Sequence, residues 1–243
     1  AFFAVGALAT PVYLALGDLV AADWRTLFLA LSVVGLLALL IGLRMRADRF
    51  VYTQEDEGKV QWRPLIRVSI AMAFYVGAEV TIFGWAPTVM ELYHGIPPIR
   101  ARLAPTLFWI GMLGGRILIA QLTHRFSAAL LLRVSALLGL LASLLLVVVP
   151  TELLLWLSLA LASLACAGIW PLIVATSGES GHETGTTAIV AAGGLGAAIF
   201  PYLAGRLAEF LPGRYILLMA APLLLAVYLL SRATPVVAAI RSK

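Results

Sequence analysis

The sequence consists largely of apolar stretches, each close to the length of a helix that crosses a membrane. A helix needs about 20 predominantly apolar residues to span roughly 30 Å of hydrocarbon. Eight such stretches follow one another between short polar segments. They predict helices at about 1–19, 26–43, 65–92, 104–122, 128–149, 152–176, 184–210 and 214–230. The predicted fold class is therefore all-α, in a polytopic membrane protein.

The composition agrees with a chain that lies mostly in lipid. Hydrophobic residues make up 62% of it and charged residues only 12%, whereas a soluble domain is about one quarter charged. The net charge of +5 comes from basic residues in the gaps between apolar stretches, where Lys and Arg anchor helix ends. They do not cluster with aromatic residues as in nucleic-acid-binding proteins. The predicted partner is the lipid bilayer, and nucleic acid is excluded.

The only cysteine, Cys166, lies in an apolar stretch. The chain can thus form no internal disulfide and shows no Cys/His spacing typical of a metal site. We interpret Cys166 as a small core residue and predict neither a metal nor a cofactor. Ala1 lies inside an apolar stretch, without an initiator Met or a basic leader, and we interpret the sequence as a truncated chain.

One connection differs from the others in length and polarity. Residues 44–64 are charged and too long for a turn, which indicates a linker between two helical bundles. We expect residues 1–43 to form two helices of a first bundle. Residues 65–243 are expected to form a six-helix bundle with a short tail, in which short turns make consecutive helices antiparallel.

The distribution of basic residues near helix ends predicts the orientation, because such residues favour the cytoplasmic side. The side with the linker carries more of them than the opposite side. We therefore expect the linker and the C-terminus to lie inside, with the protein in the cytoplasmic (plasma or inner) membrane. The linker side has Arg44, Arg46, Arg49, Lys59, Arg63, Arg67, Arg125, Arg133, Arg232, Arg241 and Lys243, and the opposite side has Arg25, Arg100, Arg102, Arg206 and Arg214.

A glycine pattern repeats within the six-helix bundle. Gly-Met-Leu-Gly at 111–114, in its second helix, recurs as Gly-Gly-Leu-Gly at 193–196, in its fifth. Three helices followed by three related helices must enter the membrane in opposite senses. The sequence therefore predicts inverted three-helix repeats, as in transporter folds.

These features resemble the major facilitator superfamily, in which a cytoplasmic loop joins two six-helix bundles. Residues 75–80 with Trp85, residues 109–116 and residues 193–205 are similar to its fucose-permease-like branch of sugar transporters. The resemblance implies that the chain holds the last eight of twelve helices. The missing N-terminal helices would then supply half of the substrate site.

The resemblance also implies a gating loop after the second helix of the six-helix bundle. The family's loop usually reads Gly-x-x-x-Asp-Arg-x-Gly, whereas residues 120–127 retain only its arginine, Arg125. His124 replaces the aspartate. The gate is then weaker or differently built, unless His124 is simply a neutral surface histidine in a turn.

Glu79 is the clearest candidate for a functional residue. It lies about 18 Å along the helix from Arg67, near the membrane midplane, where a charged side chain is costly unless it faces protein or water. A stripe of small residues on the opposite helix face favours close packing there, which leaves Glu79 and Tyr75 to face a central cavity. We expect proton coupling or substrate binding; a permanent bond to a neighbouring helix is the alternative. The stripe is Ala73, Gly77, Thr81, Gly84 and Thr88.

Three further residues are candidates for this site. Arg116 lies about 13 Å inside its helix, at a depth comparable with Glu79, and a buried guanidinium is usually paired. A pair between Arg116 and Glu79 is our hypothesis, with Arg116 extending to the membrane edge as the alternative. Trp85 and Trp109 are candidates for stacking on sugar rings, with packing or interfacial anchoring as the alternative.

No catalytic residue is predicted. Residues 177–183 combine an acid with a histidine in a flexible turn, without the context of a nucleophile elbow, and no phosphate-binding loop is present. The predicted function is secondary active transport by alternating access, with proton or ion coupling and, by resemblance, a small sugar-like solute. The alternatives are a proton-linked exporter of amphipathic compounds, with a wider and more apolar cavity, and an integral-membrane lipid-modifying enzyme.

Overall fold

The computed structural model describes residue 13 and residues 23–44, 62–177 and 183–233. Within these ranges all regular elements are helices. The chain divides into two compact units, residues 2–58 and essentially residues 59–243, and each is described by itself. The predicted helix at 1–19, most of the linker and the end of the tail lie outside the described residues. The predicted domain boundaries therefore stay predictions.

The first unit contributes the helix α2, Trp24–Arg44. Asp23 begins it, because its Oδ1 accepts hydrogen bonds from the Thr26 backbone N–H at 2.8 Å and from the Thr26 hydroxyl at 2.7 Å. These bonds stabilise the charged carboxylate and hold the pKa of Asp23 below its usual value. The residues Arg25–Arg44 are long and apolar enough to cross a membrane.

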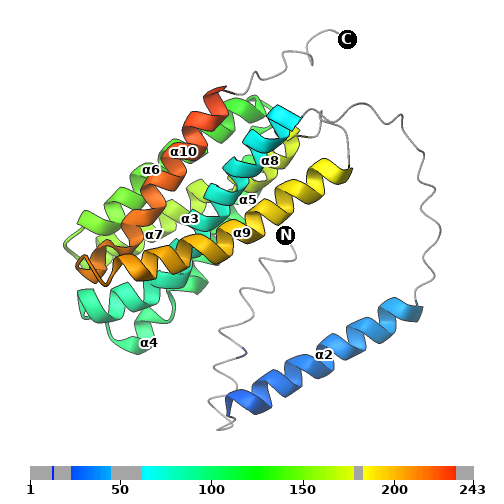
Figure 1. The fold of residues 1–243 in the computed structure, drawn as a ribbon. Coiled ribbons are helices and arrows are strands. Elements are labelled where there is room, and N and C mark those ends of the chain that lie inside the picture. The colour runs from blue at the N-terminus through cyan, green and yellow to red at the C-terminus, as the bar shows by residue number, and fades with distance from the viewer. Residues whose placement is uncertain (1–12, 14–22, 45–61, 178–182, 234–243) are drawn as a thin grey trace. The chain divides into compact units, whose positions relative to one another are not determined.

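The second unit is a bundle of six membrane-length helical stretches (Figure 1). Three of them consist of two elements each: α4 with α5, α7 with α8, and the 3-10 helix η2 with α10. Together with α2, the described residues contain seven such stretches, which confirms an all-α, polytopic membrane protein. The elements are α3 Trp62–His94, α4 Pro98–Ala101, α5 Ala104–Leu122, α6 Ala128–Val148, α7 Glu152–Cys166, α8 Ile169–Ser177, α9 Glu183–Leu207, η2 Gly213–Met219 and α10 Ala220–Ala233.

The stretch predicted as one helix at 152–176 is divided in the structure. The helix α7 ends at Cys166 and α8 begins at Ile169. Pro171 has no backbone N–H to donate to the carbonyl of Ala167, four residues earlier, and this weakens the helix at that point. The prediction missed this break because hydropathy does not change across it.

Helix packing in the bundle follows an internal two-fold pattern. The helix α5 packs against α7, and α9 packs against α3 in the same way. Likewise α6 packs against α7 and α8, while α10 packs against α3 and also against α6. Figure 1 shows α3 running between α9 and α10. The two three-helix repeats are α3 to α6 and α7 to α10. In each repeat the second and third helices pack on the first helix of the other repeat, which is the arrangement that an inverted repeat predicts.

Two glycines of the repeated pattern, Gly111 and Gly196, lie where helices of the two repeats approach closely. A Cβ atom at Gly196 of α9 would overlap the carbonyl of Ala73 in α3, and one at Gly111 of α5 would overlap the side chain of Ser163 in α7. A Cβ at Gly77 would overlap the ring of Phe200. The small-residue stripe of α3 thus does pack against another helix, as predicted, although Gly84 has open space around it.

We predict that Gly196→Ala destabilises the bundle and that Gly194→Ala does not. Both changes improve helix propensity equally, but only the Gly196 Cβ meets backbone atoms, whereas Gly194 has nothing within 4 Å. Overpacking should lower the free energy of unfolding by about 1–3 kcal/mol. The apparent melting temperature in detergent measures this, and equal values for the two variants would contradict the close crossing.

Candidate functional site

The middle of α3 carries two buried polar side chains on one face. Tyr75 is completely buried and Glu79, one turn later, is 8% exposed. Among the described residues, Glu79 is the only charged residue that is buried. A carboxylate in this position needs a partner or a function, because burying a charge away from water is costly.

Side chains from two other helices lie within electrostatic range of Glu79. They are Arg116 of α5 and Cys166, the last residue of α7. We refer to Tyr75, Glu79, Arg116 and Cys166 as the Glu79 cluster. The sequence indicated the first three; it gave no signal for Cys166, because the contact between α3 and α7 is made only by folding.

The polar groups of the Glu79 cluster are incompletely bonded. The Tyr75 hydroxyl is close enough to Glu79 to interact with it, but not in the geometry of a full hydrogen bond, and it has no other partner in the described part of the chain. Nε of Arg116 is also buried without a partner there. The described residues form no direct ion pair between Arg116 and Glu79. The cluster therefore offers two donors and a carboxylate to a further polar group.

Trp85 is engaged with the backbone of α9. Its indole N–H donates to the carbonyl of Pro201 at 3.0 Å, and its ring lies against Gly205. This bond holds α3 to α9 and occupies the only donor of the indole. The geometry favours the packing alternative for Trp85 over stacking on a substrate.

Trp109 belongs to an aromatic cluster between α3 and α5. It is 5% exposed, and its ring centroid lies 5.4 Å from that of Phe83 and 5.9 Å from that of Phe108. Phe83 follows Glu79 by four residues and so lies on the same face of α3. This spacing could have identified Phe83 from the sequence, but only the structure brings it to Trp109.

The turn between α5 and α6 contains both residues of the predicted gating loop. His124 and Arg125 are exposed, and their backbone N–H groups donate to the carbonyls of Gln121 and Leu122 at 3.3 and 2.9 Å. The turn is thus closed by its own backbone, and a gating role stays a prediction. In the described ranges no group of three His, Cys, Asp or Glu residues could hold a metal ion.

Membrane-length helices, inverted packing and a polar cluster inside the bundle are together typical of secondary transporters. The chain matches the sequence model of the Major Facilitator Superfamily over residues 1–191 and belongs to this family. No curated protein matches the chain significantly in sequence. The chain is therefore that of a multi-pass membrane transporter for small molecules, and the alternative of a lipid-modifying enzyme is wrong.

We predict opposite effects of removing the polar groups of Tyr75 and Trp85. Tyr75→Phe removes a buried hydroxyl that has no full hydrogen bond and should leave the stability unchanged or slightly higher. Trp85→Phe removes the bond to Pro201 and should lower the free energy of unfolding by about 1 kcal/mol. Thermal unfolding of both variants in detergent compares them; a marked loss for Tyr75→Phe would mean that its hydroxyl is bonded in the folded protein.

Proposed function

We propose that this transporter carries a small polar, sugar-like solute by alternating access and that Glu79 couples the transport to protons. The observation that carries the proposal is the Glu79 cluster: a buried carboxylate on α3 beside two buried donors without full hydrogen bonds, one from α3 and one from α5. The similarity of residues 75–80 and 109–116 to the fucose-permease-like branch supports the same class of substrate.

The chemistry of the cluster fits a solute with several hydroxyl groups. The Tyr75 hydroxyl and Nε of Arg116 can donate, and Glu79 can accept, so that each would complete its bonding on a polyol. Phe83 lies one turn further along α3 and packs there against Phe108 and Trp109 of α5. A sugar has polar edges and an apolar face, and aromatic rings favour contact with such a face.

Coupling to protons follows from the competing influences on Glu79. Burial favours its neutral form, whereas the guanidinium of Arg116 favours its charged form. The other groups that face it are the Tyr75 hydroxyl and the Cys166 thiol. Because these groups come from α3, α5 and α7, a movement that separates Arg116 from Glu79 would favour the neutral carboxyl, and one that brings them together would favour the carboxylate. Such a change between two conformations links proton transfer to alternating access.

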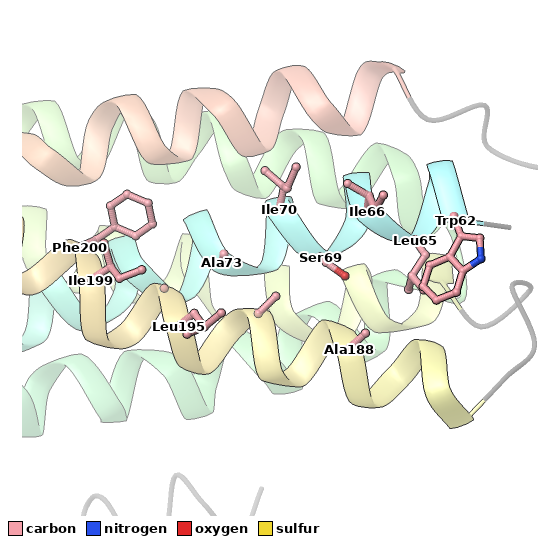
Figure 2. Close-up of a pocket in the computed structure, with 12 residues that line it drawn as sticks. Trp62, Leu65, Ile66, Ser69, Ile70, Ala73, Ala188, Leu195, Ile199 and Phe200 are labelled. Atoms are coloured by element: carbon pink, nitrogen blue, oxygen red, sulfur yellow. The ribbon is translucent and has the colours of Figure 1, made fainter. Parts of the chain in front are cut away.

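A second candidate, export of amphipathic compounds, is favoured by one observation. A groove of about 370 Å³ lies between α3 and α9. Figure 2 shows that Ile66, Ile70, Leu195 and Phe200 are among its lining residues, and that the Ser69 hydroxyl is one of its few polar atoms. An apolar groove of this kind would suit an amphipathic substrate better than a sugar.

Glu79→Gln in the full-length transporter tests the coupling. The amide keeps the shape of the side chain but cannot ionise, so we expect loss of accumulation driven by a pH gradient in proteoliposomes. Exchange of solute at equal pH should continue. Loss of affinity with an unchanged pH dependence would assign Glu79 to substrate binding alone.

Glu91→Gln is the matched control, because Glu91 lies on the same helix but is exposed. It should accumulate solute like the parent protein. Parent-level accumulation and affinity in Glu79→Gln would exclude Glu79 from the mechanism. If the parent protein instead expels amphipathic dyes and does not bind sugars, the second candidate is correct.

The orientation also belongs to this proposal, with the linker and the C-terminus inside. In a Cys166→Ala background, a cysteine introduced at Thr53 should resist an impermeant thiol reagent in intact cells and react after permeabilisation. The positive charges on the linker side are the physical reason. Labelling from outside in intact cells would reverse the topology.

A further inference from the structure

A groove with charged and apolar parts lies between α5 and α7, at the end of the bundle where α3 ends and α7 begins. Its volume is about 520 Å³, within the range of ligand pockets. It is separate from the Glu79 cluster and from the groove in Figure 2, because it shares no residue with either. Its lining is Arg100, Leu103, Thr106, Leu107, Ile110, Glu152 and Trp156.

The charged side chains of the groove have hydrogen-bonding groups that the protein itself does not fill. Oε1 of Glu152 accepts from Nη1 of Arg100 at 2.7 Å and from the indole N–H of Trp156 at 3.1 Å. Both bonds go to one oxygen, so Oε2 of Glu152 can accept another donor, and the remaining N–H groups of Arg100 can donate. The two side chains are 52% and 35% exposed, which leaves both accessible to a ligand.

A third polar group in the groove has no partner. The hydroxyl of Thr106 is buried and makes no hydrogen bond to any described residue. A buried hydroxyl without a partner is unfavourable. A ligand in the groove that accepts a hydrogen bond from it would remove this cost. The groove thus presents one cation, one anion and one neutral donor.

The apolar part of the groove continues along a membrane-spanning helix. Leu103, directly before α5, and Ile110 within it are 53% and 54% exposed, and they lie about 10 Å apart along the helix direction. Glu152 lies at the start of α7, and its partner Arg100 lies in the short helix α4 just before α5. The end of a membrane-spanning stretch is where lipid headgroups are expected, and Leu103 and Ile110 follow Arg100 along the apolar stretch Pro98–Leu122. A ligand of this groove therefore needs a dipolar head and an apolar tail.

We propose that this groove binds a zwitterionic phospholipid with a primary ammonium headgroup. Arg100 and the Thr106 hydroxyl bind its phosphate, Oε2 of Glu152 binds its ammonium group, and one acyl chain lies along Leu103 and Ile110. The carboxylate of Glu152 disfavours a headgroup that carries only negative charge. The site does not depend on the identity of the transported solute.

The test uses purified, delipidated full-length protein and three probes: palmitoyl-oleoyl phosphatidylethanolamine, palmitoyl-oleoyl phosphatidylglycerol and palmitoyl-oleoyl glycerol. Bound lipid is counted by native mass spectrometry, and the apparent melting temperature is measured with each probe. We expect phosphatidylethanolamine to bind and stabilise most. Glu152→Gln should weaken its binding about tenfold, because a charge-assisted hydrogen bond is lost, and should remove the preference over phosphatidylglycerol.

A second ion pair among the described residues supplies the matched control. Arg206 and Glu209 are also exposed and paired, but they do not line this groove, so Arg206→Gln with Glu209→Gln should leave lipid binding unchanged. Thr106→Val should weaken lipid binding without lowering the stability of the lipid-free protein. It tests the site if Glu152→Gln fails to fold. Equal binding of all three probes, a preference for phosphatidylglycerol, or unchanged binding in both groove variants would overturn the proposal.

Discussion

A backbone that crosses hydrocarbon finds no water to bond, and this constraint shapes the whole bundle. Each crossing must be helical, and packing in lipid depends on how closely helices can approach. Close approach is reached where glycine leaves room for a neighbouring helix, as between Gly196 and the backbone of Ala73 and between Gly111 and the side chain of Ser163. Each of these contacts joins one three-helix repeat to the other, so the repeats form one bundle instead of two.

The same packing determines where polar chemistry can occur. The first stretches of the two repeats, α3 and α7 with α8, are packed by helices of both repeats, and they are the most buried of the described membrane-length stretches. Tyr75, Glu79 and Cys166 lie on these two helices, and Arg116 reaches them from α5. In this chain, the only buried carboxylate among the described residues thus lies where three helices meet. The groove with Arg100 and Glu152 lies apart from this cluster, between α5 and the start of α7.

The sequence predicted the place of some residues of the site well and of others poorly. Glu79 was found easily, since a charge inside an apolar helix is a strong and local signal. Trp85 was a weaker case, because its partner Pro201 is 116 positions away in the sequence and nothing near Trp85 indicates it. Cys166 appeared to be an ordinary core residue, and the aromatic cluster around Phe83 was not recognised. The break after Cys166 was missed because it follows from a lost backbone donor and not from hydropathy.

The sequence by itself determined the class of the protein, the order of the described membrane-length stretches, and the inverted repeat, because stretch length, hydropathy and glycine spacing can be read from the chain without its folded form. Only the tertiary structure decided that Trp85 bonds to α9, that Cys166 joins Glu79, that Arg116 stays in range of the carboxylate without pairing directly, and that Arg100 and Glu152 border a groove. These facts depend on the rotation and depth of each helix against its neighbours. Apolar helix faces are nearly equivalent in lipid, so hydropathy does not determine which face of a helix packs against which neighbour. Side-chain packing determines this.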